Sequence, residues 1–354
     1  MFQRILVIRG GAIGDFILTL PALKVLREAD LNAHIEILGY KRIAALAENR
    51  FYAQAVRSIE YGPLSSFFTR NSELSAELTG YFASFDLVIS YLYDPDRIFE
   101  RSLGQCGVKN LLCGPAKIVE KNGHAAKQLA RPVEELGIRV ADLTERIFLS
   151  VNDRQFAQEF LRNSSRPIVA IHPGSGSKEK NWPLENWIEL VSSKGGLSKA
   201  KGGLGHMGKQ PSLVVVSGEA DEAQVAQLEH AWKDRDVRFA KDLPLPHLAA
   251  VLEHTIFLGH DSGISHLAAA AGANCILLFG ATDPNVWAPR NENVQVLTAQ
   301  SGKVSDLEIE SVQAAVTAAL SRCLNEDARN RSVTISDHIC DTKLSVGSRL
   351  GFTP

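Results

Sequence analysis

The sequence predicts an α/β protein with two doubly wound domains, each built on a parallel sheet. Short apolar runs alternate with amphipathic stretches, and this rhythm starts a second time after a polar join near residues 150–166. Strands that alternate with helices indicate parallel sheets covered on both faces, and two such series indicate two domains. The length of 354 residues agrees, since one domain takes about 150 residues.

The first series spans residues 1–160, which we assign to an N-terminal domain. Short apolar runs predict its buried strands, which are Ile5–Ile8, His34–Leu38, Ala55–Ile59, Asp86–Ser90 and Val108–Leu112. The amphipathic stretches between them predict its helices, which are Asp15–Ala29, Lys41–Ala47, Asn71–Ala83 and Ala125–Leu136.

The second series spans residues 161–320 and predicts a C-terminal domain of the same kind. Its expected strands are Ile168–Ile171, Leu213–Val216, Thr255–Leu258, Cys275–Phe279 and Val294–Leu297. Its expected helices are Pro183–Ser193, Asp221–Trp232, Leu248–Glu253, Ser262–Ala271 and Ser305–Leu320. Two segments stand outside this pattern. Residues 194–211 hold six glycines and four lysines and predict a mobile loop, and residues 321–354 predict a loosely packed polar tail.

Charge and cysteine content exclude several classes of protein. Lys and Arg number 38 against 40 Asp and Glu, and this balance argues against a strongly basic nucleic-acid binder. The five cysteines are scattered without Cys-x-x-Cys spacing, which argues against a zinc ribbon or a disulfide framework. The N-terminus runs directly into Ile5–Ile8, and no apolar run reaches the roughly 20 residues of a membrane span. We therefore expect a cytoplasmic protein without a signal peptide.

A glycine-rich turn, Arg9-Gly10-Gly11-Ala12-Ile13-Gly14-Asp15, follows the first strand and opens a helix. Small residues let a ligand approach the backbone, and a helix N-terminus favours an anion. The dinucleotide fingerprint Gly-x-Gly-x-x-Gly would need glycine in place of Arg9, which argues against a nicotinamide site. The Asp15 carboxylate has two possible roles at this point. It either stabilises the first turn of the helix or faces a ligand.

A second turn, His172-Pro173-Gly174-Ser175-Gly176-Ser177, follows the strand Ile168–Ile171. Glycine and serine N–H groups at the carboxyl edge of a parallel sheet can cradle a phosphate. Lys180 lies close enough in sequence to reach the same phosphate, and Pro183 suits the first position of the next helix. His172, Gly174, Ser175 and Lys180 are therefore candidate ligand contacts.

A third turn, Gly259-His260-Asp261-Ser262-Gly263-Ile264-Ser265-His266, again joins a strand end to a helix start. The Ser262 hydroxyl and the N–H groups of Ser262 and Gly263 can bind a second phosphate. His266 follows one turn into the helix.

Thr282 and Asp283 close the next strand, so three strand ends converge on one crevice. This layout is the one expected for a nucleoside diphosphate. A metal site made of His260, Asp261 and His266 is the disfavoured alternative, because no tight pair at i, i+4 and no cysteine supports it.

Two further features have an ordinary and a functional interpretation. Asp94-Pro95-Asp96 follows a predicted strand, and we favour a turn over a metal site. Residues 101–131 carry six basic residues against one acidic residue, a local balance of +5. This stretch is either a solvated face or a surface for an anionic acceptor or the inner membrane leaflet. The tryptophans do not interleave with these basic residues, so RNA binding gains no support.

In combination, these motifs resemble the ADP-heptose:lipopolysaccharide heptosyltransferases, glycosyltransferase family 9. The matching residues are Arg9–Asp15 with Leu20-Pro21-Ala22-Leu23, His172-Pro173-Gly174, Lys180 with Trp182-Pro183, Asp261–His266 and Thr282-Asp283-Pro284. The resemblance covers residues 4–320 and implies the GT-B architecture, in which two Rossmann-like doubly wound domains face each other across a cleft. It places the acceptor in the N-terminal domain and the nucleotide sugar in the C-terminal domain.

The resemblance also implies an inverting, metal-independent transfer with no cofactor, for which heptose from ADP-heptose is the expected donor. Carried over by position, Asp15 is the general base and Lys180 neutralises the departing diphosphate. The implied substrate-binding residues are Gly14, His172, Gly174, Ser175, Asp261, Ser262, Gly263, His266, Thr282 and Asp283. Members often carry an acidic ribose-binding residue where this chain has Ala220, which is flanked by Glu219 and Asp221.

The implied partners are an ADP-linked sugar donor and an anionic glycolipid acceptor, such as a lipopolysaccharide core, with peripheral contact to the inner membrane leaflet. Two alternatives of other classes stay open. One is a nucleotide-sugar epimerase of GT-B type, which needs no acceptor. The other is a non-catalytic nucleotide-sugar-binding protein, in which Asp15 is only a helix cap.

Overall fold

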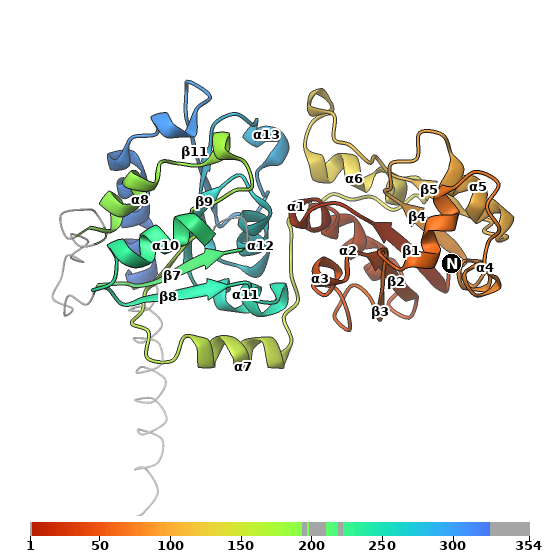
Figure 1. The fold of residues 1–354 in the computed structure, drawn as a ribbon, viewed down its shortest axis with the longest axis horizontal. Coiled ribbons are helices and arrows are strands. Elements are labelled where there is room, and N and C mark those ends of the chain that lie inside the picture. Colours follow the sequence, from red (N-terminus) through yellow and green to blue (C-terminus); the bar gives the residue numbers. More distant parts are fainter. Residues whose placement is uncertain (1, 193–196, 198–209, 219–221, 326–354) are drawn as a thin grey trace, which may run out of the picture.

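Two parallel-sheet domains lie side by side in the computed structural model, which describes residues 2–192, 197, 210–218 and 222–325 (Figure 1). The first sheet has the strand order β3-β2-β1-β4-β5, and the second has the order β11-β10-β9-β6-β7-β8. All neighbouring strands pair in parallel. Each domain's first strand lies inside its sheet with later strands on both sides, so the doubly wound expectation is confirmed.

The strands agree closely with those expected from the apolar runs. The first sheet contains β1 (Arg4–Arg9), β2 (His34–Gly39), β3 (Ala55–Ser58), β4 (Leu87–Ser90) and β5 (Leu111–Cys113). The second contains β6 (Ile168–Ile171), β7 (Ser212–Ser217), β8 (Val237–Lys241), β9 (Ile256–His260), β10 (Asn274–Phe279) and β11 (Val294–Thr298). Strand β8 was not predicted, because Ala240 is its one fully buried residue and no apolar run marks it.

The central strands bury side chains on both faces. In β1, Ile5 and Val7 belong to one core cluster, while Leu6 and Ile8 belong to the cluster on the opposite face of the sheet. This double burial explains why the strands read as continuous apolar runs. The cluster that holds Ile5 and Val7 continues into the second domain, where it includes Ala268. The two domains therefore share a hydrophobic seam.

Helices cover the sheets and carry the turns at their carboxyl edges. In the first domain they are α1 (Ile13–Ile17), α2 (Leu20–Ala29), α3 (Lys41–Ala44), α4 (Ala76–Ala83), α5 (Ile98–Gln105) and α6 (Ala125–Glu134). Later in the chain they are α7 (Val151–Phe160), α8 (Leu184–Val191), α10 (Glu222–Ala231), α11 (Leu245–Leu252), α12 (Gly263–Ala271) and α13 (Pro284–Trp287). Short 3-10 helices are η1 (Gly62–Phe68), η2 (Glu120–Asn122), η3 (Lys178–Lys180) and η5 (Val304–Asp306). Residues 309–325 are also helical.

Two of the expected irregular segments fall largely outside the described residues. The glycine-rich stretch 194–211 is described only at residues 197, 210 and 211. Of the expected tail 321–354, residues 321–325 continue the helix that starts at residue 309, and the rest lies outside the described residues.

The join between the domains contains a helix that its polar sequence did not predict. Residues 138–150 form an irregular connection, and α7 follows it and packs against α11 of the second domain (Figure 1). An ion pair of 2.6 Å between Arg50 and Asp153 ties α7 back to the first domain. Among the described residues, none of the helices has the length and apolar content that crossing a membrane requires.

Candidate active site

A pocket of about 340 Å³ lies where the carboxyl ends of the second sheet's strands meet helix α1 of the first domain. Parallel sheets of this type bind ligands at the carboxyl ends of their strands. Its lining combines the turns after β1, β6 and β9 with the ends of β7 and β8. The residues are Ala12, Ile13, Arg42, Ile43, His172, Ser175, Gly176, Val216, Ser217, Gly218, Asp242, Leu243, Leu245, Leu248, Ser262, Gly263 and Ile264.

Asp15 lies in the first turn of α1, in the same turn as the lining residues Ala12 and Ile13, but it does not itself line the pocket. Its Oδ2 accepts a hydrogen bond of 3.0 Å from the backbone N of Ala12, so it does stabilise the helix start. The side chain is nevertheless 39% exposed, which leaves room for a second role. Gly11 is required beside it, because its φ is +95° and a Cβ there would lie 2.7 Å from Asp15 Oδ2.

Arg9 has a buried side chain that supports the start of helix α1 and does not form part of a ligand-binding loop. Its Nη2 donates to the Asp15 carbonyl at 3.0 Å and its Nε donates to Thr19 Oγ1 at 3.1 Å. Nη2 also lies 3.5 Å from Asp15 Oδ1. Burial lowers the pKa of Arg9, and the Asp15 carboxylate opposes that shift. This structural role explains why arginine occupies the position that a dinucleotide fingerprint would give to glycine.

Lys180, Asp261 and Thr282 form one polar cluster, although they come from three separate turns. Lys180 Nζ lies 2.6 Å from Asp261 Oδ2, and Thr282 Oγ1 donates to the same oxygen at 2.7 Å. The Asp261 side chain is only 11% exposed, whereas that of Lys180 is 29% exposed. The structure thus brings together residues that the sequence had assigned to phosphate and sugar binding, and it pairs their charges.

The start of α12 faces the pocket with its first residues. Ser262 caps the helix, accepting a 3.3 Å hydrogen bond from Ser265 N, and its Oγ lies 3.4 Å from His172 Nδ1. Ser175 also lines the pocket and donates to Asn181 Oδ1 at 2.6 Å. Backbone N–H groups at the start of this nine-residue helix are therefore available to an anion.

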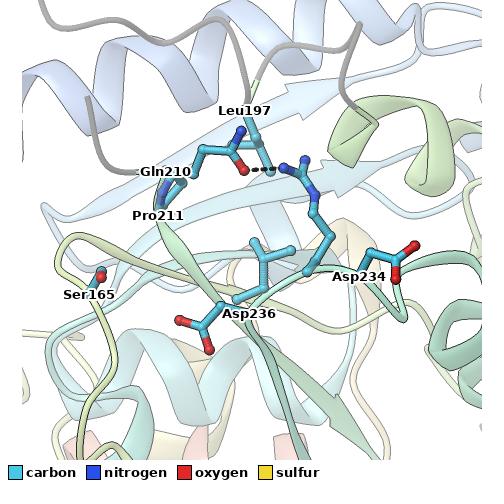
Figure 2. Close-up of a pocket in the computed structure, with 8 residues that line it drawn as sticks. Ser165, Leu197, Gln210, Pro211, Asp234 and Asp236 are labelled. Atoms are coloured by element: carbon cyan, nitrogen blue, oxygen red, sulfur yellow. Dashed lines mark hydrogen bonds between the residues drawn. The ribbon is translucent and has the colours of Figure 1, made fainter.

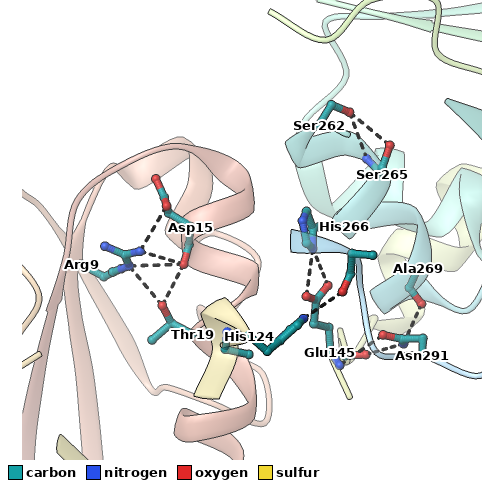
Figure 3. A network of polar contacts seen from close by, with 12 residues as sticks. Arg9, Asp15, Thr19, His124, Glu145, Ser262, Ser265, His266, Ala269 and Asn291 are labelled. Carbon is teal, nitrogen blue, oxygen red and sulfur yellow. Dashed lines mark hydrogen bonds and ion pairs between the residues drawn. The ribbon is translucent and has the colours of Figure 1, made fainter. Parts of the chain in front are cut away.

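His266 lies behind the helix start and contacts Glu145, a residue that sequence analysis did not single out (Figure 3). Its Nδ1 is 2.9 and 3.0 Å from the two carboxylate oxygens. Both side chains are almost inaccessible, at 5% and 0% exposure. Burial acts to lower the pKa of His266, but Glu145, with smaller contributions from Asp261 and Asp15, raises it above the ordinary value.

Two further residues that line the pocket, Asp242 and Arg42, do not belong to any of the sequence motifs. Asp242 directly follows β8 with a φ of +47° and places Oδ1 4.0 Å from the position of a Cβ at Gly218. Aspartate tolerates this left-handed conformation better than most residues. Arg42, on helix α3 of the first domain, also lines the pocket. The positions that we had considered for ribose binding, Glu219 and Asp221, lie outside the described residues.

Other candidates have local structural roles. Asp283 caps α13 by accepting from Asn285 N at 2.8 Å, and the Gly174 carbonyl lies 3.4 Å from His260 Nδ1. His260 Nε2 accepts from Trp182 N at 2.8 Å, so this nitrogen serves the fold. Asp94 accepts from the backbone N of Ile98 and Glu100 at the start of α5, which confirms the turn interpretation. Within the described residues, no group of three or more His, Cys, Asp and Glu side chains is placed to hold a metal ion.

A second hollow of about 340 Å³ lies at the amino ends of β7 and β8, away from these turns (Figure 2). Gln210 and Arg235 are hydrogen-bonded across it, and Asp234 and Asp236 lie at its border. Ligands of doubly wound sheets bind at the opposite edge. This hollow is therefore not part of the candidate active site.

The sequence model of glycosyltransferase family 9 (heptosyltransferase) matches residues 114–316. This chain belongs to that family. The resemblance that the motifs indicated is confirmed, and the protein is a glycosyltransferase.

Similarity to known proteins of family 9 extends over most of the chain. Lipopolysaccharide heptosyltransferase 3 of Escherichia coli K12 is 24% identical over 305 residues, which cover 79% of this chain and 83% of that protein. The crystal structure of a family 9 glycosyltransferase from Veillonella parvula has a TM-score of 0.72 at 20% identity, covering 90% of this chain and 97% of that one. Escherichia coli heptosyltransferase WaaC with ADP has a TM-score of 0.62 at 18% identity, with coverages of 88% and 98%. These likenesses confirm the GT-B fold.

Proposed function

We propose that this family 9 enzyme transfers a heptose from ADP-heptose to a lipopolysaccharide core or a related cell-surface glycan, with inversion and without a metal ion. The relatives named as lipopolysaccharide heptosyltransferases and the solved complex with ADP support this donor and this acceptor. In this proposal residues 1–160 bind the acceptor and residues 161–320 bind the nucleotide sugar.

The observation that carries the proposal is the arrangement of charge beside the start of α12, which lines the pocket. Lys180 pairs with Asp261 in the turn that precedes this helix, and the partly exposed Asp15 lies on helix α1 of the first domain, which contacts α12; neither Lys180 nor Asp15 is itself a lining residue. Cationic groups on the donor side and a carboxylate on the facing side suit a displacement at a sugar carbon.

The reaction follows from these positions. The acceptor hydroxyl attacks the anomeric carbon while its proton passes to the Asp15 carboxylate. A carbon–oxygen bond to the acceptor forms, the bond to the β-phosphate oxygen breaks, and ADP leaves with the electron pair. Attack on the face opposite the leaving group inverts the anomeric centre. Lys180 and the N–H groups of Ser262 and Gly263 stabilise the charge that develops on the diphosphate, which is the task that Mg²⁺ performs in other transferases.

Nucleotide recognition would use the remaining lining. Leu243, Leu245 and Leu248 offer an apolar wall to the base, and the Asp242 carboxylate offers an acceptor to a ribose hydroxyl. On the acceptor side, the basic residues Lys117, Lys127 and Arg131 support an anionic glycolipid. Lys117 Nζ lies 4.9 Å from the ring centre of the exposed Tyr93, at the carboxyl edge of the first sheet.

A transfer assay tests the proposal directly. The enzyme is incubated with ADP-heptose, EDTA and a heptose-deficient lipopolysaccharide core, and mass spectrometry follows the acceptor. We expect one added heptose per acceptor and release of ADP, with the inverted anomer by NMR. Conversion of the donor sugar without an acceptor would instead favour an epimerase. Tight ADP binding with no reaction on any acceptor would favour a binding protein.

A further inference from the structure

Glu145 and His266 form an ion pair that is fully enclosed by protein. Glu145 is 0% exposed and lies 2.9 Å from the Nδ1 atom of His266, which is itself 5% exposed. A buried carboxylate is costly unless a cation or several hydrogen bonds compensate it. Among the residues that the structure describes, His266 is the one cationic side chain in contact with this carboxylate.

Three parts of the molecule meet at the His266 ring (Figure 3). Glu145 belongs to the irregular connection between the domains, and Asn291 fixes its backbone by a 2.9 Å hydrogen bond from Nδ2 to the Glu145 carbonyl. The other side of the ring faces the first domain, since its Cδ2 lies 3.5 Å from the position of a Cβ at Gly14. The ring therefore stands between the domain connection and the turn that carries Asp15.

The charges around the ring favour its protonated form. Burial opposes that form, but Glu145, Asp261 and Asp15 all raise the pKa of His266, and the net shift is upward. The neighbouring His124, which caps the start of α6, does not compete for the proton, because burial lowers its pKa. The nearest carboxylates have their own cations, Lys180 for Asp261 and Arg9 for Asp15, so Glu145 is the partner that depends on His266.

We propose that Glu145 is a positioning residue that keeps His266 an imidazolium, so that a fixed positive charge stands where helices α1 and α12 meet. This inference rests on the proposed function, because the charge then acts on the donor diphosphate expected at the start of α12. Glu145 does not line the pocket and its side chain is 0% exposed, so it acts only through His266.

The pair also explains why the partner is a glutamate and not an amide. A neutral ring with a proton on Nδ1 would satisfy Gln equally well, because an amide oxygen also accepts that hydrogen bond. Only a carboxylate adds the negative charge that favours a second proton on Nε2. Glu145→Gln therefore keeps the shape and the hydrogen bond of the site and removes the charge.

The test compares ADP-heptose binding by the wild-type protein and by Glu145→Gln between about pH 6 and pH 8, without acceptor. A nucleotide-sugar diphosphate has no secondary phosphate ionisation, so the ligand itself does not titrate in this range. The wild-type affinity should change little with pH. The variant should bind about tenfold more weakly near pH 8 and recover part of the loss as the pH falls below about 6.5, where a ring without the carboxylate regains its proton.

The matched control is Asp153→Asn. Asp153 is 3% exposed and ties helix α7, which packs on α11 of the second domain, to Arg50 of the first domain, but it does not line the pocket. Its removal should lower thermal stability without giving ADP-heptose binding a new pH dependence. If both variants lost the same amount of ADP-heptose affinity at every pH, Glu145 would only join the domains and the proposal would be wrong. Unchanged ADP-heptose affinity of Glu145→Gln would also overturn it. A wild-type protein that does not bind ADP-heptose would instead overturn the proposed function.

A measurement on the wild-type protein covers the case in which Glu145→Gln does not fold. In protein labelled with ¹⁵N-histidine, the His266 ring signals are assigned by their absence from His266→Gln. Both ring nitrogens of His266 should carry protons at about pH 7, above the ordinary histidine pKa of about 6.5. A neutral ring at that pH would contradict the proposal whether or not the donor has been identified.

Discussion

Gly14 of helix α1 and Gly263 of helix α12 touch each other across the domain boundary. A Cβ on Gly263 would lie 2.9 Å from the backbone nitrogen of Gly14 and 2.8 Å from Ile13 Cβ, closer than real Cβ contacts. A Cβ on Gly14 would lie 3.5 Å from Gly263 Cα, which is an ordinary contact. The close approach of the two helix starts therefore depends on glycine at one of these positions and not on the other.

Gly263→Ala should separate the two helix starts, because the added methyl group meets backbone of the other domain. Overpacking of this kind costs about 1–3 kcal/mol. We expect a lower melting temperature and a larger radius of gyration by small-angle X-ray scattering. Gly14→Ala is the matched control and should keep both values near those of the wild type. Equal effects of the two substitutions would contradict the observed asymmetry.

Asp15→Asn tests the general base. Asparagine keeps the oxygen that accepts the Ala12 N–H bond, so the helix start should survive, while the proton acceptor is lost. We expect ADP affinity near that of the wild type and a kcat lower by about 10²–10⁴-fold. Asp94→Asn is the control, because Asp94 also caps a helix start of the first domain. A variant Asp15→Asn that keeps most of the kcat would leave Asp15 as a helix cap only.

Most of the strands could be predicted from the sequence, and so could the sheet edge at which several of the candidate residues lie. Buried parallel strands are continuous apolar runs, and the turns that follow them must lie at one edge of the sheet. This reasoning placed Lys180, Asp261 and Thr282 in one crevice, and the structure brings their side chains into contact. It could not show that Lys180 and Asp261 pair with each other, since a spacing of 81 residues carries no information on charge pairing.

Features that depend on tertiary contacts were missed. Glu145 lies in a connection without periodicity, and its partner His266 is 121 residues away. The expected helix over residues 15–29 is divided at Leu18–Thr19. In a continuous helix the Asp15 carbonyl would accept a hydrogen bond from the Thr19 N–H group. Here it accepts from Thr19 Oγ1 and from the buried Arg9 side chain instead. A local pattern cannot reveal that a buried arginine from the preceding strand competes for a helix carbonyl.

Lys180→Ala should weaken ADP binding in EDTA-containing buffer. A charge-assisted contact to phosphate contributes about 1.5–3 kcal/mol, which corresponds to roughly a tenfold or greater loss of affinity. Within the described part of the chain, the variant also leaves Thr282 as the one direct partner of the Asp261 carboxylate, which is 11% exposed, so repulsion of the diphosphate adds to the loss. The exposed neighbour Lys178 provides the control, and Lys178→Ala should bind ADP normally. Titration calorimetry measures all three proteins, and equal affinities would remove Lys180 from the site.

Asp242→Ala should distinguish recognition of the nucleoside from recognition of the phosphates. If its carboxylate accepts a ribose hydroxyl, ADP should bind more weakly by about 1 kcal/mol, roughly fivefold, whereas inorganic pyrophosphate should bind equally well. The control Asp234→Ala removes a carboxylate from the hollow at the opposite sheet edge and should affect neither ligand. Equal losses for ADP and pyrophosphate would show that Asp242 acts on the whole pocket and not on the ribose.

His124 should make the protein less stable in mild acid. Its Nε2 lies 2.9 Å from the Ala288 carbonyl and donates to it, and its Nδ1 accepts from Ala126 N at the start of α6, so both ring nitrogens are used in the neutral form. Burial lowers the pKa of His124 in the folded protein, opposed by the bond to Ala288. Below the unfolded pKa of about 6.5, the unfolded chain binds a proton that the folded ring resists, so stability falls as the pH falls.

The slope from one such group is at most about 1.4 kcal/mol per pH unit. His124→Asn keeps a good helix cap and removes the titrating ring, so the melting temperature should fall less between about pH 7 and pH 5 than in the wild type. His254→Asn is the control, because His254 is 70% exposed and loses little solvation on folding.

His266 acts in the opposite direction: its raised pKa stabilises the folded protein at low pH, and this contribution is lost as the pH rises through the folded value. The melting temperature of Glu145→Gln should therefore fall more steeply in acid than that of the wild type, whereas that of His124→Asn should fall less steeply. If the melting temperatures of the two variants changed in parallel over this pH range, the assignment of opposite charge states to these two histidines would be wrong.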